Sequence, residues 1–460
     1  MSPVWRPNRH TVQPSYYLDP FGCVKNQVDA ENMMAHLDAS GWLSAADAAT
    51  ADLIIVNSCG FIEDAKRESI DAVMEWRRLY PDKKILLAGC LAQRYSKDLA
   101  ESLPEVDGFF GTDDITGITG AVKSMGLGGS LRVGGSGGLS TGDRPLLSLP
   151  GSAYVKISEG CDNNCSYCAI PLIRGPLRCR SVRDIADECR GLLARGVREL
   201  CIIGQDIGAY RSGDAGLPEL LAAIAELPGD FWVRLLYIHP DHFPLPILDL
   251  MERDGRFLPY FDIPFQHASG AVLSAMNRNG SAETYLALVR TIRDRLPAAV
   301  IRTTFLVGFP GETGGDFAAL LDFQEKLRPD WLGCFSYSRE EDTAAYDMPG
   351  QVAKKTALAR KLKVEETQVR ITEENMERFV GQTFDVMLEE KLDDETGGAG
   401  EEDLWLGRLY CHAPEVDGAA IVTGAAAVGT EKPQAGNVLP CKVVACRGFV
   451  LEVSLSRPLS

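Results

Sequence analysis

The sequence predicts an α/β protein in three parts: an N-terminal doubly wound parallel sheet, a central partial βα barrel and a small C-terminal all-β barrel. Three observations lead to this prediction. Short apolar runs alternate with helical stretches along most of the chain. A segment at 126–142, where eight of seventeen residues are glycine, interrupts the alternation like a flexible linker. The tail from residue 379 has only short apolar runs separated by turns.

The first part, residues 15–125, predicts a parallel sheet with helices on both faces. Strands are expected at 16–18, 52–57 and 84–88, and helices at 30–40 and 62–80. A Gly/Ser-rich linker over 126–150 separates this part from the next.

Residues 151–378 continue the alternation and predict a full or partial barrel of the TIM type, in which the carboxyl ends of the strands carry the active site. The expected strands are 154–157, 199–203, 232–237, 260–263, 300–307 and 332–336, and a long charged helix covers 353–378. The tail, 379–460, is expected to form strands at 383–388, 420–422, 438–444 and 449–453.

The charge of the chain limits its partners. It has 47 Lys and Arg against 64 Asp and Glu, a net charge of −17. An acidic chain argues against broad nucleic-acid binding and favours a basic partner.

No apolar run is long enough for a membrane helix, and no secretory signal opens the chain, so a cytoplasmic, reducing compartment is expected. Thirteen cysteines are then unlikely to form a disulfide framework, and metal or cluster chemistry is the better default.

Three of these cysteines, Cys161, Cys165 and Cys168, lie within eight residues, just after the predicted strand 154–157. Thiolates suit iron–sulfur clusters or zinc, but a structural zinc site needs four protein ligands, and Cys179 is eleven residues further on. Three thiolates on a four-iron cluster leave one iron open for chemistry. Zinc, or three buried thiols, is the alternative from the residues alone.

Three other cysteines are far apart in sequence. Cys23, Cys59 and Cys90 each follow a predicted strand of the N-terminal sheet. The carboxyl ends of such strands face one crevice, so the three thiols can converge there. From the residues alone, a second cluster and three structural cysteines are about equally well supported.

The CxxxCxxC spacing after the first barrel strand resembles the signature of radical S-adenosylmethionine enzymes. The resemblance implies a 4Fe-4S cluster on Cys161, Cys165 and Cys168, with S-adenosylmethionine on the open iron and Tyr167 near its adenine. Cleavage of this cofactor yields a radical that removes hydrogen from an unactivated C–H bond.

Within that group the chain resembles the methylthiotransferases. The matching segments are 22–31, 57–62, 88–91, 156–161, 170–175 and 413–418, the last in a tail that looks like a TRAM domain. The resemblance implies a second 4Fe-4S cluster on Cys23, Cys59 and Cys90, and a second S-adenosylmethionine as methyl donor. Asp19 and Pro20 depart from the family's apolar first strand, so we expect that strand to end early. The remaining cysteines are interpreted as structural: Cys179, Cys189, Cys201, Cys334, Cys411, Cys441 and Cys446.

Two substrates are candidates within this family: an aspartate of small-subunit ribosomal protein number twelve, and an adenosine of tRNA. Segments 25–29, 156–159, 262–267 and 302–313 look more like the enzymes that modify the aspartate. The tail from 379 to 460 has thirteen acidic and six basic residues, a net charge of −7. Such a tail repels tRNA and suits a basic ribosomal protein, although an acidic surface also serves solubility alone.

Further residues are expected at the barrel mouth. Gly204 and Gln205 follow one strand, and Gly308 and Glu312 follow another. Arg278 is expected to hold a carboxylate of the cofactor or substrate. For these residues, as for His239 and His267, a purely structural role is about as well supported.

Two functions of other classes remain open: a non-enzymatic iron–sulfur module that docks on ribosomes, and a zinc-binding adaptor. For the enzyme, a reductant such as flavodoxin or ferredoxin is expected as a partner.

Overall fold

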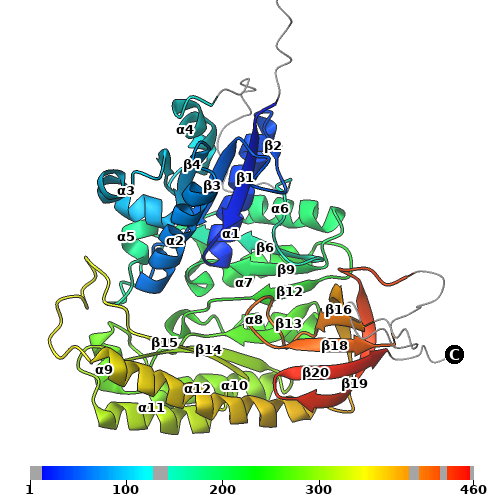
Figure 1. Cartoon of the computed structure of the whole chain (residues 1–460). Coiled ribbons are helices and arrows are strands. Elements are labelled where there is room, and N and C mark those ends of the chain that lie inside the picture. The colour runs from blue at the N-terminus through cyan, green and yellow to red at the C-terminus, as the bar shows by residue number, and fades with distance from the viewer. Residues whose placement is uncertain (1–12, 128–142, 393–403, 425–431, 456–460) are drawn as a thin grey trace, which may run out of the picture. The chain divides into compact units, whose positions relative to one another are not determined.

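The computed structural model describes residues 13–127, 143–392, 404–424 and 432–455, and the chain divides into two compact units that meet at Leu147 and Ser148 (Figure 1). Most of the predicted linker, residues 128–142, lies outside the described residues. The second unit contains both the central barrel and the C-terminal barrel.

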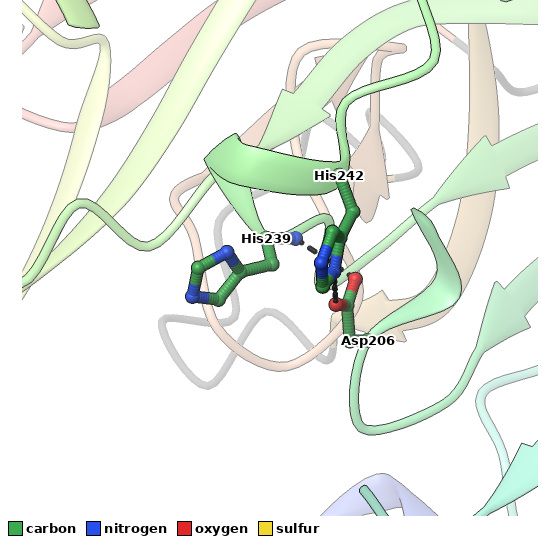
Figure 2. A group of neighbouring side chains, drawn as sticks. All are labelled: Asp206, His239 and His242. Carbon is green, nitrogen blue, oxygen red and sulfur yellow. Dashed lines mark hydrogen bonds and ion pairs between the residues drawn. The ribbon is translucent and has the colours of Figure 1, made fainter. Parts of the chain in front are cut away.

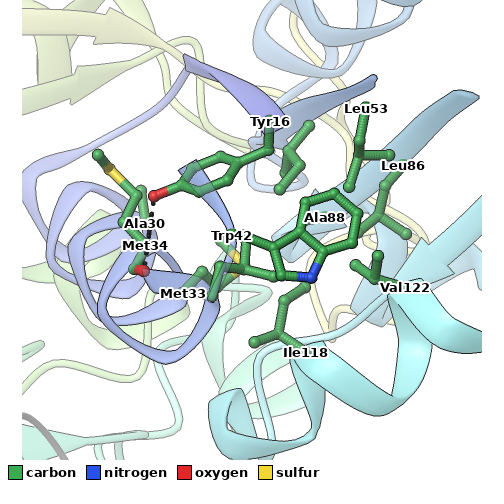
Figure 3. Packing of buried hydrophobic residues seen from close by; sticks show 12 residues of the cluster. Tyr16, Ala30, Met33, Met34, Trp42, Leu53, Leu86, Ala88, Ile118 and Val122 are labelled. Atoms are coloured by element: carbon green, nitrogen blue, oxygen red, sulfur yellow. Dashed lines mark hydrogen bonds between the residues drawn. The ribbon is translucent and has the colours of Figure 1, made fainter. Parts of the chain in front are cut away.

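The first unit is a five-stranded parallel sheet in the order β2-β1-β3-β4-β5. Its strands are β1 (Ser15–Pro20), β2 (Leu43–Ser44), β3 (Leu53–Ser58), β4 (Lys84–Gly89) and β5 (Gly108–Phe110). Helices α1 (Val24–Ala39) and α4 (Ile118–Ser124) pack on one face, where Tyr16, Met33 and Trp42 form part of the core (Figure 3). Helices α2 (Glu63–Leu79) and α3 (Cys90–Ser102) cover the other face. The predicted doubly wound sheet is confirmed.

Strand β1 does not end early, so that expectation is wrong. Asp19 pairs with Val56, and Pro20 pairs with Asn57. Proline has no N–H to donate to a neighbouring strand. Because β2 pairs only with Ser15 and Tyr16, Pro20 has no neighbouring strand on the β2 side, and no hydrogen bond is lost there. The carboxylate of Asp19 accepts a hydrogen bond from the indole N–H of Trp76 at 2.5 Å.

Helix α1 begins at Val24, six residues before the predicted start at residue 30. Its first turns bury polar side chains, among them Lys25, Asn26 and Asp29. This buried polar face hides the apolar spacing from which a helix is recognised. The short strands β2 and β5 were also not predicted.

The central part is a six-stranded parallel sheet in the order β15-β14-β13-β12-β9-β6, and its two end strands do not pair in the described chain. The predicted partial barrel is therefore confirmed. Its strands are β6 (Ser152–Lys156), β9 (Glu199–Ile203), β12 (Trp232–Leu235), β13 (Phe257–Asp262), β14 (Val300–Val307) and β15 (Trp331–Ser336). Strand β12 stops before the predicted residue 237, because Tyr237 has a φ of 68°, which breaks an extended strand.

Helices surround this sheet: α5 (Ile170–Arg174), α6 (Val182–Ala194), α7 (Leu217–Ala225), α8 (Ile247–Arg253), α9 (Gly270–Ala275), α10 (Ala282–Arg295), α11 (Gly314–Leu327) and α12 (Lys354–Met376). Short elements join them: the paired strands β7 (Ser158–Glu159) and β8 (Arg178–Cys179), the paired strands β10 (Arg211–Ser212) and β11 (Ala215–Gly216), and 3-10 turns η2 (Ile207–Ala209), η3 (Pro240–His242) and η4 (Glu377–Phe379). A further turn, η1 (Ile115–Gly117), precedes α4.

The tail forms the predicted all-β barrel, which is closed in the order β16-β17-β18-β20-β19. Its strands are β16 (Thr383–Leu392), β17 (Leu404–Arg408), β18 (Ala419–Thr423), β19 (Val438–Arg447) and β20 (Val450–Leu455). Strand β17 was not predicted, because it ends in Gly407 and Arg408. Arg408 is buried there, which its residue type does not suggest.

The closed barrel contacts residues at the N-terminal ends of the central strands. Arg408 bonds to Glu199, the first residue of β9, and the indole of Trp331, the first residue of β15, donates to the carbonyl of Cys411 at 2.7 Å. The carboxyl ends of the central strands, where the cysteine loop lies, are at the opposite end of the sheet.

Candidate metal centres and active site

The first candidate centre is formed by Cys23, Cys59 and Cys90, which follow the adjacent strands β1, β3 and β4. The strand order reverses between β1 and β3, and ligands of doubly wound sheets bind at such a switch point. The exposure of the cysteines falls from Cys23 (exposed) through Cys59 to Cys90 (buried). The site is therefore open to solvent on the Cys23 side.

Glycines let the three loops touch. A Cβ added to Gly22 would lie 3.2 Å from the Cβ of Cys59, and one added to Gly60 would lie 2.7 Å from the carbonyl oxygen of Cys90. No real Cβ approaches a backbone oxygen so closely, so position 60 requires glycine, and position 22 favours it because Gly22 has a φ of 95°. These contacts bring the three cysteine loops together, and the predicted cluster on their thiols stays a prediction.

Asn26 links the same loops. Its side-chain amide donates to the carbonyl of Ser58 at 2.8 Å, and its Oδ1 lies 3.0 Å from the Sγ of Cys90. Asn57 donates to the backbone carbonyl of Asn26 at 2.8 Å.

The helices add a favourable field at this centre. Cys23 is the N-cap of α1, Cys90 is the first residue of α3, and α2 starts four residues after Cys59. Helix N-termini stabilise thiolates and anions. Three thiolates, two of them at helix N-termini, are a chemically suitable set of ligands for an iron–sulfur cluster.

The second candidate centre is the loop between β7 and α5 that carries Cys161, Cys165 and Cys168. Backbone bonds fix it at several points: Cys161 N–H donates to the carbonyl of Gly175 at 3.2 Å, and Ser166 N–H donates to that of Met276 at 3.1 Å. Burial raises the pKa of Cys168 to about 12. A thiol buried in this way loses its proton when it binds a metal, so metal binding and deprotonation are coupled here.

A buried ion-pair triad supports the start of this loop. The carboxylate of Glu159 lies 2.5 Å from Lys156 Nζ and 2.6 Å from Arg174 Nη1. Burial alone would raise the pKa of Glu159, but the two cations outweigh it and lower the pKa to about 2. The triad holds β6, the cysteine loop and α5 together.

Arg278 is the cation nearest to the cysteine loop. It is buried, its Nη1 lies 3.9 Å from Cys165 Sγ and 3.5 Å from the hydroxyl of Tyr167, and its Nη2 donates to the carbonyl of Pro264. The ring of Tyr167 packs edge-on against Phe309, 6.5 Å between centroids. The structure thus brings Tyr167 and Arg278 to the cysteines, and their predicted roles toward a cofactor stay predictions.

Gly204 lies next to the start of the cysteine loop, whereas Gly308 and Glu312 contact helix α12. A Cβ on Gly204 would lie 2.6 Å from Ser158 Oγ, and one on Gly308 would lie 2.4 Å from the Cβ of Ala357 in α12. Glu312 accepts the N–H of Gly308 and lies 3.0 Å from Arg360 of the same helix. These two residues shape a turn against α12, and Gln205 is half-buried beside Gly204.

The two histidines use one ring nitrogen each to accept a backbone N–H. His239 Nδ1 accepts from Asp241 at 3.2 Å, and His267 Nδ1 accepts from Ser269 at 3.0 Å. These bonds fix the orientation of both rings and leave the Nε2 atoms for other contacts.

One functional candidate, Asn163, escaped the sequence prediction. Asn163 lies inside the cysteine loop, and its side chain donates to Asp206 at 2.9 Å. Tyr237 and Gln266 follow barrel strands with φ near 68° and 67°. Such backbone strain is concentrated at functional sites, but no residue pattern announces it.

Neither cysteine trio suits one zinc ion. Three thiolates on a single zinc lie about 4 Å apart, given Zn–S bonds of about 2.3 Å. One trio among the described residues has all its ligand atoms within 4.8 Å of one another: Asp206, His239 and His242 (Figure 2). Neither cysteine trio meets this spacing. More widely spaced thiolates fit a larger inorganic cluster.

Comparison with known proteins finds three family matches along the chain. Residues 15–111 match the uncharacterized protein family UPF0004, residues 155–323 match the radical SAM superfamily, and residues 380–454 match the TRAM domain. Among solved structures, the radical S-adenosylmethionine methyltransferase TsrM from Kitasatospora setae is similar in fold, with a TM-score of 0.56 at 16% identity over 73% of this chain and 77% of that one.

Relatives match over nearly the whole length. The ribosomal protein uS12 methylthiotransferase RimO of Treponema denticola is 44% identical over 95% of this chain and 99% of its own. The RimO proteins of Natranaerobius thermophilus and Pelotomaculum thermopropionicum are 40% and 42% identical, each over 87% of this chain and 91% of its own. The chain therefore belongs to the RimO family of radical SAM methylthiotransferases.

Proposed function

We propose that this chain is a radical S-adenosylmethionine methylthiotransferase that adds a methylthio group to the β-carbon of an aspartate in ribosomal protein uS12. The observation that carries the proposal is the pair of cysteine trios, one on three neighbouring loops and one on a single loop, each at the carboxyl end of a parallel sheet. The identity to RimO proteins over nearly the whole chain supports it. Two 4Fe-4S clusters and S-adenosylmethionine are its cofactors.

The barrel trio fits the radical-generating cluster. With a 4Fe-4S cluster and S-adenosylmethionine bound there, the site supplies a 5′-deoxyadenosyl radical. Cys161, Cys165 and Cys168 would be the three protein ligands of this cluster and would leave one iron open for the cofactor. Arg278 places a fixed cation beside Cys165, where it can bind a carboxylate of the cofactor or of the substrate. Tyr167 and Phe309 form an apolar wall that excludes water from the radical.

The N-terminal trio fits the second cluster, which takes part in sulfur delivery. Its opening on the Cys23 side leaves room for a sulfur-containing reactant, and the helix N-termini at Cys23 and Cys90 favour an anionic one. A second S-adenosylmethionine supplies the methyl group.

The charge of the C-terminal barrel favours the protein substrate over tRNA. With a net charge of −7 over residues 379–460, this part attracts a basic ribosomal protein and repels RNA phosphates. We propose the cytoplasm as the place of the reaction, and flavodoxin or ferredoxin as the class of reductant. No helix of the described residues is long and apolar enough to cross a lipid bilayer.

One anaerobic competition tests the proposal. The enzyme, reconstituted with both clusters, receives S-adenosylmethionine, a reductant and sulfide, together with a peptide from the uS12 aspartate loop and a tRNA. A methylthio mass gain on the peptide aspartate is expected. A gain on the tRNA base would keep the chemistry and overturn the substrate, and intact S-adenosylmethionine would overturn the enzyme class.

A further inference from the structure

In its first turns, helix α12 (Figure 1) exposes two lysines and two leucines. Lys354 and Lys355 are the first two residues of the helix. Leu358 and Leu362 follow Lys354 at intervals of four residues, so these three side chains lie on one face. The leucines have exposed fractions of 53% and 56%. Exposed apolar side chains beside charged ones mark an interaction site, and we call these four residues the α12 patch.

The two lysines do not stabilise the helix that carries them. The N-terminus of a helix has a partial positive charge, which favours acidic residues and disfavours cations. The first turn of α12 contains no acidic residue. Further along the helix, Arg360, Lys361 and Lys363 form ion pairs, whereas no ion pair within the described ranges involves Lys354 or Lys355. The charges of these two lysines are therefore available to a partner.

The patch belongs to a cationic segment of an acidic chain. Residues 353–364 contain five Lys and Arg and no Asp or Glu, although the whole chain has a net charge of −17. The loop before the helix carries Glu341, Asp342 and Asp347, so the cationic segment begins at Lys354. Opposite charges attract across an interface and speed its formation. The patch therefore fits a partner that carries negative charge around an apolar centre.

Packed residues connect the patch with the cysteine loop. Ala357, which precedes Leu358, is buried against Gly308, where an added Cβ would lie 2.4 Å from the Cβ of Ala357. Phe309 is the residue after Gly308, and its ring packs edge-on against that of Tyr167, with 6.5 Å between the centroids. Tyr167 belongs to the cysteine loop. A continuous run of packed residues therefore leads from the patch to the candidate radical centre.

The loop that leads into α12 touches the cysteine loop as well. The N–H of Ala345 donates to the carbonyl of Ser166 at 2.8 Å, and the carbonyl of Gly350 accepts the N–H of Gly311 at 2.9 Å. Ser166 lies between the second and third cysteines, and Gly311 lies in the turn after β14. These bonds hold the start of α12 at the end of the barrel that carries the cysteines.

We propose that the α12 patch is the docking surface for the one-electron donor of the radical cluster, and that this donor is an acidic carrier protein. The inference rests on the proposed function, because it requires a 4Fe-4S cluster on the barrel cysteines. In each encounter the carrier is oxidised by one electron and the cluster is reduced by one. Electron-transfer complexes are small, which suits a patch of four side chains. RNA phosphates also attract lysines, but the exposed leucines favour a protein.

The test compares two reductants on the holoenzyme. Reduced flavodoxin is the probe for the carrier, and dithionite is a small reductant that needs no docking surface. In Lys354→Glu/Lys355→Glu, 5′-deoxyadenosine formation with subsaturating flavodoxin should fall about tenfold or more at low salt, with the dithionite rate unchanged. The difference should shrink in about 1 M salt, where charges are screened. Glutamates suit the N-terminus of a helix, so the loss cannot come from unfolding.

A second variant and a control separate the apolar and charged parts of the patch. Leu358→Ser/Leu362→Ser should weaken the binding of oxidised flavodoxin at low and high salt alike, as measured by titration calorimetry. Lys97→Glu/Lys442→Glu is the matched control, because it reverses two exposed lysines of α3 and β19. Its flavodoxin-driven rate should equal that of the parent protein.

Four outcomes would overturn the inference. Equal flavodoxin rates in the parent and in Lys354→Glu/Lys355→Glu would do so, and an equal loss with dithionite would show a structural role. A parent dimer that Leu358→Ser/Leu362→Ser dissociates in sedimentation would assign the patch to a second copy. RNA binding lost in the lysine variant, with flavodoxin binding intact, would assign it to RNA. If dithionite yields no 5′-deoxyadenosine in the parent, the proposed function fails, and calorimetry with flavodoxin still decides the docking.

Discussion

The guanidinium of Arg408 in the closed barrel binds the carboxylate of Glu199 in the central barrel at 2.6 Å, and both side chains are buried. Arg234 binds the second oxygen of Glu199 at 2.7 Å, and Arg408 also bonds to Glu389. Burial alone would raise the pKa of Glu199, but the two guanidinium groups lower it to about 2. A charged network therefore joins the two barrels of this unit.

We expect Arg408→Met to lower the free energy of unfolding by about 3–5 kcal/mol. The substitution leaves Glu389 and part of Glu199 buried without their cation, which is the costly way to break a buried ion pair. Denaturant unfolding measures the loss. Arg447→Met is the control, because its 2.6 Å pair with Glu452 is largely exposed and should contribute at most about 1 kcal/mol. Equal losses in both variants would contradict the importance of the network.

The same junction gives a pH dependence. His412 is fully buried, and its pKa is lowered to about 3 by burial and by the nearby Arg408 and Arg234. In the unfolded chain it takes up a proton near pH 6.5, whereas in the folded chain it stays neutral until about pH 3. The unfolded state therefore binds more protons between these values, and stability falls as the pH falls.

We expect this histidine to cost up to about 1.4 kcal/mol per pH unit below pH 6.5. His412→Gln should remove that part of the slope. The measurement is the free energy of unfolding of both proteins between pH 7 and pH 5, since the difference between them cancels the other titrating groups. Parallel curves would show that His412 is not the cause.

Much of the fold follows from apolar runs and from periodicity. Central strands such as β6 and β9 are buried along their whole length and are predicted as continuous apolar runs, whereas the long helix α12 buries one face. The errors have a common physical origin: α1 and β17 bury charged or polar groups such as Asn26 and Arg408, whose partners are distant in sequence. A pattern of residue types does not show that a distant carboxylate neutralises a cation.

The candidate sites divide in the same way. Strand ends bring Cys23, Cys59 and Cys90 together, and this is predictable because parallel strands point their carboxyl ends to one edge. The bond between Asn163 and Asp206 is not predictable, because it depends on side-chain directions in two loops. Gly308 packs against α12, whereas Glu312 lies between Arg360 of α12 and His267, which follows β13, so their predicted site roles stay predictions.

Gly60→Ala tests the convergence of the N-terminal loops. The new Cβ would lie 2.7 Å from the carbonyl of Cys90, so the Cys59 and Cys90 loops must separate. We expect iron to fall from about eight to about four atoms per chain, with the radical cluster retained. Gly120→Ala in α4 is the control, because nothing lies within 4 Å of its Cβ position, and its iron content should not change. Full iron in Gly60→Ala would mean that the loops tolerate separation.

The two trios should fail in different ways when one cysteine is removed. Cys161→Ala should abolish formation of 5′-deoxyadenosine, because the radical cluster loses one of its three protein ligands. Cys59→Ala should leave cleavage of S-adenosylmethionine in place and block sulfur insertion, because only the N-terminal centre is damaged. Chromatography of the nucleoside and mass spectrometry of the uS12 peptide measure the two outcomes in one reaction.

Cys446→Ala, at a half-buried cysteine outside both trios, is the control and should change neither outcome. A methylthio product from Cys59→Ala would remove the N-terminal centre from sulfur delivery, and 5′-deoxyadenosine from Cys161→Ala would place radical formation elsewhere.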